Sequence, residues 1–344
     1  MTRRAVVDLA STATTMALPA SGADRLAAFT PDGWELVVVQ SPTESSGDGT
    51  NSVSQEALEA VATAEVYFGY GLPASLVAAA PQLRWAHSAS AGVGKSITPE
   101  LLSAGLVFTN SAGVYGEAMA DSVLAAVMHF TRGLDFAVRL QAASQWEKEP
   151  FHTEQFALRE VADLRVLVIG AGGIGSAVAT RFTALGADCT GVRRRPELGV
   201  PPGFARVIGV DALDDALKSA DVVVLAAPLT ALSRGVLDTR RLALLPAAAI
   251  VVNVARGALM DEEALVAALD SGRLRGAYLD VFRREPLPET NALWTHPRVL
   301  ITPHVSGVSA ARHWGRALAL FEDNWRRWVA GESLRNVVDP AAGY

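Results

Sequence analysis

The chain of 344 residues is longer than one hydrophobic core usually supports, so its length favours two domains. Half of its residues are hydrophobic, only 19% are charged, and its mean hydropathy is +0.24, which excludes a largely disordered protein. A formal net charge of -6 makes nucleic acid a poor partner, so a small-molecule substrate is the better expectation.

Two features of the sequence bear on where the protein works. Arg3 and Arg4 precede an apolar run, as in an export signal, but Asp8 falls inside that run, so a first strand over 5–9 is favoured. No apolar stretch is long enough for a membrane-spanning helix, and the single cysteine, Cys189, has no second cysteine with which to form an internal disulfide. We therefore predict a cytoplasmic protein in a reducing compartment, with no membrane as partner.

Short β-rich runs and helical runs alternate in the first hundred residues. The predicted elements are strands over 34–39, 66–69 and 83–87, a helix over 55–62, and a surface loop over the Ser-, Gly- and Thr-rich segment 41–54. From 116 to about 140, apolar residues recur at helical spacing with Gly133 as the only interior glycine. This pattern predicts one long connecting helix after an α/β region.

The alternation of strands and helices restarts after this helix and is more regular. The predicted elements are strand 165–169, helix 173–185, strand 188–192, helix 211–219, strands 222–226 and 249–253, helix 261–269, and strands 276–280 and 299–301. The strands are nearly continuous apolar runs, which is typical of a parallel sheet covered by helices on both faces. A doubly wound α/β domain is therefore predicted.

A Gly-rich turn joins the first strand and the first helix of this domain. Gly170, Gly172 and Gly175 have the spacing G-x-G-x-x-G, with Gly173 and Ile174 between the second and third. In this motif the first glycine allows a tight turn, the second lets the backbone approach a pyrophosphate, and the third allows close packing of helix and strand. The N-terminus of the helix then favours phosphate. A bound dinucleotide is predicted, and the alternative is a Gly-rich turn without a ligand.

The end of the second strand indicates which dinucleotide binds. An NAD site normally has Asp or Glu at this place to hold the ribose hydroxyls, but here Val192 is followed by Arg193, Arg194 and Arg195. Guanidinium groups suit a 2′-phosphate, which a carboxylate would repel. The sequence therefore predicts NADP, with NAD as the second choice. The alternative is a solvated loop of arginines.

Three polar residues follow strands of the predicted sheet, where open α/β sheets bind ligands: Arg256, Glu285 and His304. His304 has an ordinary pKa near neutrality and is the expected proton donor to a ketone oxygen. Glu285 would stabilise the imidazolium and fix its tautomer, and Arg256 would bind a substrate carboxylate and polarise the carbonyl beside it. Each residue alone has a structural explanation, but together they predict carbonyl reduction.

Three further residues are assigned to the cofactor. Asp280 is expected to orient the nicotinamide amide, and Pro228 and Ala255, which follow other strands of the sheet, are expected to contact the cofactor. No metal is predicted, because the remaining histidines lack partners at metal-ligand spacing: His87, His129, His152, His296 and His313.

Three ordered segments of the sequence carry a resemblance to a known family. They are Asn253-Val-Ala-Arg256-Gly257 followed by Asp261-Glu262, Leu279-Asp280-Val281-Phe282 followed by Glu285-Pro286-Leu287-Pro288, and Thr302-Pro303-His304. With these segments the chain resembles the D-isomer specific 2-hydroxyacid dehydrogenases, and in particular those that act on glyoxylate and hydroxypyruvate. The resemblance implies that the catalytic roles fall on Arg256, Glu285 and His304.

The resemblance also carries expectations for the fold. It implies a Rossmann-type doubly wound cofactor domain over 115–305, inserted into a smaller flavodoxin-like α/β substrate domain made of 1–114 and 306–344. In the smaller domain, Ala91-Gly92-Val93 is similar to the loop whose backbone N–H groups hold the substrate carboxylate. A homodimer is also implied, together with a hinged closure that excludes water from the hydride path.

The leading hypothesis is an enzyme that moves a hydride between NADP(H) and a small D-2-hydroxy or 2-keto acid. One alternative is a cofactor-sensing corepressor, which the absence of long polar tails and of a basic patch disfavours. Another is a related dehydrogenase for a different acid or an inorganic oxyanion, because Arg256 binds anions generally. Four residues are candidates to line the pocket for the substrate side chain: Tyr70, Leu72, Trp294 and Trp314. All four could equally be ordinary core or interface residues.

Overall fold

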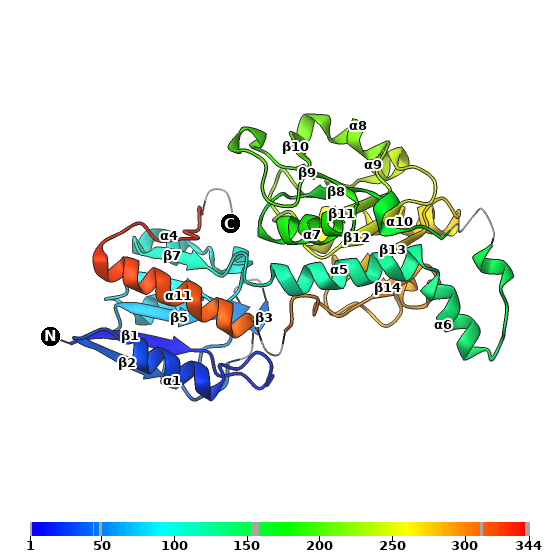
Figure 1. Cartoon of the computed structure of the whole chain (residues 1–344). Helices are drawn as coiled ribbons and strands as arrows, with labels where there is room; N and C mark the ends of the chain where they lie inside the picture. Colours follow the sequence, from blue (N-terminus) through cyan, green and yellow to red (C-terminus); the bar gives the residue numbers. More distant parts are fainter. Residues whose placement is uncertain (1, 44, 48–49, 153–157, 310–311, 341–344) are drawn as a thin grey trace. The chain divides into compact units, whose positions relative to one another are not determined.

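The chain folds into two α/β units (Figure 1). The computed structural model describes residues 2–43, 45–47, 50–152, 158–309 and 312–340. One unit consists of Met1–Tyr115 and Val308–Tyr344, and the other, Gly116–Gly307, is inserted into it. Each unit contains one large parallel sheet, so the predicted α/β class and the predicted insertion are confirmed.

The sheet of the first unit has five parallel strands in the order β2-β1-β5-β6-β7. The strands are β1 (Arg3–Asp8), β2 (Trp34–Val38), β5 (Val66–Gly69), β6 (Trp85–Ser88) and β7 (Val107–Asn110). The helices are α1 (Ala20–Phe29), α2 (Gln55–Val61), α3 (Ala74–Ala79), α4 (Pro99–Ala104) and α11 (His313–Ala330). Without the small hairpin strands, this is the flavodoxin-like order.

The core of the first unit lies on both faces of its sheet. Ala5 and Val7 of β1 pack in the cluster that holds residues of α1 and α11. Val6 lies between them in the chain and packs in the cluster that holds residues of α2, α3 and α4. Successive side chains of a strand point to opposite faces, so a continuous apolar run serves both cores.

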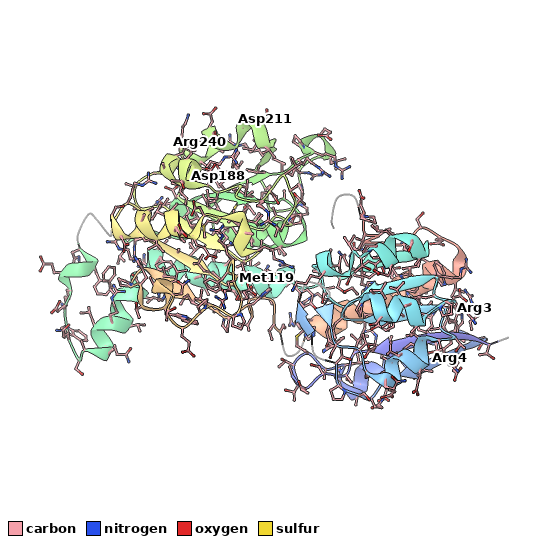
Figure 2. All side chains as sticks on the ribbon, turned by 180° about the vertical axis from the view of Figure 1, so that it is seen from behind. Arg3, Arg4, Met119, Asp188, Asp211 and Arg240 are labelled. Atoms are coloured by element: carbon pink, nitrogen blue, oxygen red, sulfur yellow. The ribbon has the colours of Figure 1, made fainter. Side chains whose placement is uncertain are left out.

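The two arginines at the start of the chain belong to the first strand. Arg3 donates from Nε to Glu65 at 2.7 Å, and Arg4 donates from Nε to Glu35 at 3.0 Å. Figure 2 shows the two arginines at this end of the first unit. Asp8 closes the strand and is fully buried. The preference for a strand at this place is therefore confirmed.

The sheet of the second unit has seven parallel strands in the order β10-β9-β8-β11-β12-β13-β14. The strands are β8 (Arg165–Ile169), β9 (Asp188–Val192), β10 (Arg206–Ile208), β11 (Val222–Leu225), β12 (Ile250–Asn253), β13 (Gly276–Leu279) and β14 (Val299–Ile301). The helices are α5 (Gly116–Thr131), α6 (Leu134–Ala142), α7 (Gly173–Ala184), α8 (Leu213–Leu217), α9 (Thr239–Leu244) and α10 (Glu262–Asp270). The strand order reverses at β8, which makes the β8/β11 boundary the switch point where such sheets bind ligands.

Two cores cover the faces of this larger sheet. Leu167 and Ile169 of β8 pack with residues of α8, α9 and α10, whereas Val166 and Val168 pack with residues of α5 and α7. Cys189 of β9 is a buried free thiol on the second of these faces. Because both faces are covered, polar side chains of this unit gather at the ends of its strands.

Three sequence predictions differ from the structure. The single helix predicted from 116 to about 140 is wrong, because Gly133 has a φ of +69° in the left-handed region and separates α5 from α6. The predicted loop over 41–54 contains a small hairpin, β3 (Ser45–Gly47) and β4 (Thr50–Asn51), although residues 44 and 48–49 lie outside the described part. The helix predicted over 211–219 is a 3-10 turn, Val210–Ala212, followed by the short α8.

In the part of the chain that the structure describes, every helix is too short or too polar to cross a membrane.

Candidate active site

The Gly-rich turn lies between β8 and α7, and packing requires two of its glycines. Gly170 has a φ of +114°, and a Cβ added there would lie 2.5 Å from the backbone of Ala226 and Ala227, which follow β11. A Cβ at Gly175 would lie 2.0 Å from the carbonyl oxygen of Gly170. No other residue fits at either position, because the turn and the helix pack directly on backbone.

The second glycine of the motif is not required by the protein's own packing. A Cβ added at Gly172 would meet no described atom within 4 Å. Gly172 is the N-cap of α7 and provides no side chain to cap it, so the first turn of the helix keeps N–H groups for a ligand. This open cradle at a helix N-terminus fits a pyrophosphate.

The arginines after β9 lie at the carboxyl end of that strand. The Arg193 N–H donates to the Ile208 carbonyl at 3.1 Å, while Arg194 and Arg195 are exposed. The acidic residue of the strand, Asp188, is at its opposite end, so β9 brings no carboxylate to this place. Pro228 follows β11, and its carbonyl accepts from the Ser233 hydroxyl at 2.7 Å.

Arg256 lies in a short loop after β12 that Asn253 holds. The Asn253 side chain is fully buried, accepts from the Ala255 N–H at 3.1 Å, and donates to the Arg256 carbonyl at 3.0 Å. Gly257 follows directly, and a Cβ there would lie 1.9 Å from the carbonyl carbon of Phe282. The arginine loop is therefore in backbone contact with the segment that leads to Glu285.

His304 and Glu285 form a hydrogen-bonded pair between the loops after β14 and β13. Nδ1 of His304 lies 2.7 Å from Oε2 of Glu285, and the other carboxylate oxygen accepts from the Phe282 N–H at 2.9 Å. The side chains are 38% and 35% exposed, so the pair has access to a substrate. Because Nδ1 is bonded to Glu285, Nε2 is the ring nitrogen that could exchange a proton with a substrate.

The pair shifts the pKa of both partners. The hydrogen bond to Glu285 raises the pKa of His304 above its ordinary value, against the opposing effects of burial and of the Arg256 charge. Burial alone would raise the pKa of Glu285, but hydrogen bonds from His304 and from the Phe282 N–H outweigh it and lower that pKa. The Arg256 charge also lowers the Glu285 pKa, so the guanidinium acts on both members of the pair.

Asp280 is occupied by the loop that carries His304. Its side chain is buried, and its carboxylate accepts from the Thr302 hydroxyl at 2.5 Å, from the Val305 N–H at 2.9 Å and from the Ser306 N–H at 3.1 Å. His304 has a φ of +56°, and its N–H donates to the Asp280 carbonyl at 2.8 Å. Asp280 thus holds an unfavourable backbone conformation in place. Its predicted contact with the nicotinamide amide stays a prediction.

The loop predicted to hold a substrate carboxylate lies after β6 in the first unit. The Asn110 amide donates to the Ala91 carbonyl at 2.9 Å, and the Ser111 N–H donates to the Ser90 carbonyl at 3.1 Å. Within the described ranges, the N–H groups of residues 91–93 donate to no protein acceptor. Three consecutive donors on a braced loop suit an anion.

The candidate wall residues for a substrate side chain differ in exposure. Tyr70, Leu72 and Trp314 are buried in the cores of the first unit, whereas Trp294 is 49% exposed. The first three therefore behave as core residues.

The residues that hold the loops of the candidate site were not among those predicted from the sequence. Asn253 was available as a signal, since an amide at the last position of an apolar strand has to find partners when buried. Asn110 at the end of β7 is the same signal in the first unit. The sequence carries no such signal for Gly257, because the close backbone contact that excludes a side chain there forms only when two loops distant in the chain meet.

Comparison with known proteins identifies the family of this site. Residues 124–306 match the model of the D-isomer specific 2-hydroxyacid dehydrogenase, NAD binding domain. Glyoxylate/hydroxypyruvate reductase A of Salmonella paratyphi B (strain ATCC BAA-1250 / SPB7) is 34% identical over 253 residues, which cover 72% of this chain and 75% of the relative. The chain belongs to the D-isomer specific 2-hydroxyacid dehydrogenase family. It is therefore an NAD(P)-dependent enzyme of that family.

Two structures of this family are similar to the whole chain. The dehydrogenase of Xanthobacter autotrophicus Py2, in complex with NADPH and MES, has 30% identity and a TM-score of 0.79, with 99% of both chains covered. The NADPH-dependent glyoxylate/hydroxypyruvate reductase of Sinorhizobium meliloti, in complex with NADP and sulfate, has 26% identity and a TM-score of 0.78, with 99% of this chain and 100% of that chain covered. The two-unit 2-hydroxyacid dehydrogenase fold is thereby confirmed.

Proposed function

We propose that this dehydrogenase reduces a small 2-keto acid of the glyoxylate or hydroxypyruvate class with NADPH. The observation that carries the proposal is the bonded pair of His304 and Glu285, with the Arg256 loop in backbone contact beside it. These groups lie on loops that follow strands of one sheet, and the Gly-rich turn at the switch point of that sheet has room for a pyrophosphate. Relatives named glyoxylate/hydroxypyruvate reductase support the substrate class.

His304 is the proposed proton donor. Glu285 engages Nδ1 and favours the imidazolium, so Nε2–H is the proton that the developing alkoxide takes up. Arg256 is proposed to bind the keto-acid carboxylate with its planar fork, and its charge stabilises the oxygen that becomes negative. In the first unit, the N–H groups of Ala91, Gly92 and Val93 are proposed as donors to a substrate carboxylate.

The cofactor is proposed to rest on the Gly-rich turn. When bound, the reduced nicotinamide supplies the hydride. Gly172 with the N-terminus of α7 would hold the pyrophosphate, Arg193 and Arg194 would bind the 2′-phosphate, and Asp280 would orient the carboxamide. Pro228 and Ala255 would also contact the cofactor, since they follow neighbouring strands of the same sheet. The NADPH and NADP complexes of the two relatives support this preference.

A panel of 2-keto acids with NADPH and with NADH tests this function by the loss of nicotinamide absorbance. We expect oxidation of NADPH by glyoxylate or hydroxypyruvate, and a drop in kcat of about 10²–10⁴-fold in His304→Ala with the NADPH Kd unchanged. His296→Ala is the control, because that histidine pairs with Asp270 and has no part in the proposed reaction. Full activity of His304→Ala would refute the mechanism, and tight cofactor binding without turnover of any acid would favour a sensor.

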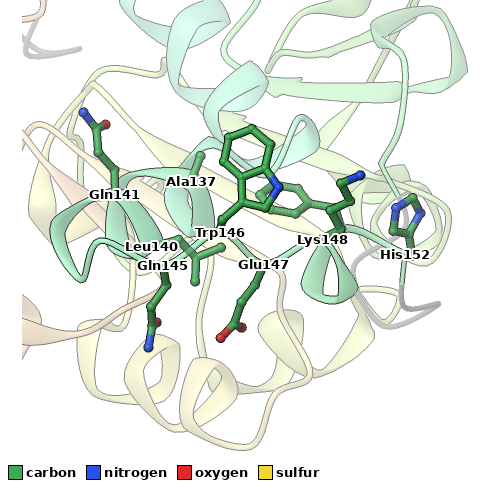
Figure 3. Close-up of a pocket in the computed structure, with 9 residues that line it drawn as sticks. Ala137, Leu140, Gln141, Gln145, Trp146, Glu147, Lys148 and His152 are labelled. Carbon is green, nitrogen blue, oxygen red and sulfur yellow. The ribbon is translucent and has the colours of Figure 1, made fainter.

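A second copy of the chain is the proposed partner of the arm, which we define as residues 134–152. A cavity of about 480 Å³ lies in this segment, and Leu140, Phe151 and Trp146 are among the residues that line it. Figure 3 shows this pocket with Leu140 and Trp146 labelled. Trp146 is 91% exposed and Val138 is 58% exposed. A projecting indole next to an apolar cavity on one segment is suited to a two-fold contact, in which each copy fills the cavity of the other.

The arm is anchored and carries balanced charge, which supports this pairing. Asp135 and Arg275 form a buried ion pair at 2.7 Å that fixes α6 to the start of β13. The other charged side chains of the arm are two cations and two anions: Arg139, Lys148, Glu147 and Glu149. Two copies therefore meet without net repulsion. The cytoplasmic location stays a prediction.

A further inference from the structure

The turn between β13 and Glu285 presents two adjacent peptide N–H groups to two different glutamates. The Phe282 N–H donates to Oε1 of Glu285 at 2.9 Å, and the next N–H, that of Arg283, donates to Oε1 of Glu262 at 2.6 Å. The first bond holds the carboxylate that binds His304. The second bond is accepted by Glu262, a residue that has no part in the proposed reaction.

Glu262 belongs to the first turn of α10, but the helix does not need it as a cap. Asp261 is the N-cap, and its side chain accepts from the Ala264 N–H at 3.1 Å. Glu262 instead points to the turn after β13 and is partly buried there, which raises the pKa of its carboxyl group. A helix residue is thus fastened to a turn that lies 21 positions further along the chain.

The same peptide is also held by Gly257. A Cβ at Gly257 would lie 1.9 Å from the Phe282 carbonyl carbon and 2.2 Å from the Arg283 nitrogen, so backbone packs on backbone at this place. The peptide between Phe282 and Arg283 is therefore fixed by the arginine loop through Gly257 and by α10 through Glu262. A peptide plane with two attachments cannot rotate freely about its neighbours.

We propose that Glu262 is a positioning residue, whose carboxylate accepts the Arg283 N–H and thereby sets the turn from which Phe282 directs Glu285 toward His304. This inference rests on the proposed function of the pair. Without that acceptor the peptide keeps only its packing on Gly257 and gains freedom to rotate, so the Phe282 N–H is held less well against Glu285 and the carboxylate loses its fixed orientation. His304 then keeps its partner for only part of the time, and its pKa falls toward the ordinary value.

The charges around both groups determine how the test has to be built. His304 is influenced by Glu285, Arg256 and Asp280, and Glu262 is influenced by Arg283, Glu285 and Asp261. Removal of the Glu262 charge would therefore also act on the pair through space. The test has to separate the hydrogen bond from the charge.

Three substitutions make this separation. Glu262→Met removes the acceptor and keeps the length, Glu262→Gln removes the charge but keeps an amide oxygen as acceptor, and Glu263→Ala removes an exposed charge from the same helical turn. Glu262→Ala is a second variant without an acceptor, in case the methionine variant does not fold. The readouts are the His304 pKa by NMR, with the resonance assigned from His304→Ala, and kcat/KM with NADPH and the keto acid.

We expect Glu262→Met to lower the His304 pKa by about 0.5–1 units and kcat/KM by about tenfold, while Glu262→Gln and Glu263→Ala stay close to the parent protein. An equal shift in the Gln and Met variants would overturn the proposal, because charge alone would then explain the effect. An unchanged His304 pKa in the variants without an acceptor would overturn it as well. The NMR titration needs no turnover, so it remains decisive even if the proposed reaction is wrong.

Discussion

Nδ1 of His304 lies 2.7 Å from Oε2 of Glu285, and this contact ties a histidine in a left-handed backbone conformation to the turn after the neighbouring strand. The two residues follow consecutive strands, β13 and β14, whose carboxyl ends lie at one edge of the sheet. The bond fixes which ring nitrogen is free and raises the affinity of the ring for a proton. The dependence of the reaction on pH follows from this pair.

Keto-acid reduction is expected to fail at high pH. The proposed donor is the imidazolium, and its pKa is raised above the ordinary value of 6.5, so kcat/KM falls as the pH rises through that raised pKa. In Glu285→Gln the raising partner is lost, and the fall is expected to begin at lower pH. The measurement is a pH profile of kcat/KM with NADPH and glyoxylate. An identical profile in Glu285→Gln would contradict the role of the pair.

Arg256→Lys is expected to impair use of the keto acid more than use of the cofactor. Lysine keeps the charge but loses the planar fork, so one charge-assisted hydrogen bond of about 1.5–3 kcal/mol is lost, which raises KM for the acid about 10- to 100-fold. Steady-state kinetics with both substrates varied measure the effect. Arg240→Lys is the control, since Arg240 pairs with Asp214 on the surface. If the variant loses more affinity for NADPH than for the acid, Arg256 binds the cofactor rather than the substrate carboxylate.

Two alanine substitutions in the Gly-rich turn are expected to affect different properties, stability in one case and cofactor binding in the other. Gly170→Ala forces a Cβ to 2.5 Å from the backbone of Ala226 at a φ of +114°, so we expect Tm to fall by about 5 °C or more. Gly172→Ala meets no described atom, so we expect an unchanged Tm and a weaker Kd for NADPH. Thermal unfolding and cofactor titration of both variants test this. If Gly172→Ala binds NADPH as tightly as the parent protein, the pyrophosphate does not bind against Gly172.

The sequence indicated the proposed reacting groups more clearly than the residues that hold their loops. The convergence of Arg256, Glu285 and His304 could be predicted because parallel strands end at one edge of a sheet, so residues that follow the strands come together there. The hydrogen bonds by which Asp280 holds the His304 loop were not predicted, because a carboxylate at the end of a strand could equally bind a ligand. The break at Gly133 was missed for a related reason, since a single glycine is often tolerated inside a helix and only its φ decides.

Trp146→Glu is expected to separate two copies of the chain. The indole is 91% exposed beside an apolar cavity, and a carboxylate in its place would have to be buried without a partner in the proposed contact. We expect the dissociation constant of the dimer to rise roughly 30-fold or more, as for a residue that dominates an interface. Sedimentation velocity measures this, with Leu232→Glu as the control, because Leu232 is 81% exposed but lies outside the arm. If Trp146→Glu leaves the association state as in the parent chain, the arm is not the contact surface, because an apolar surface that binds a second copy cannot accept an unpaired charge at its most exposed residue.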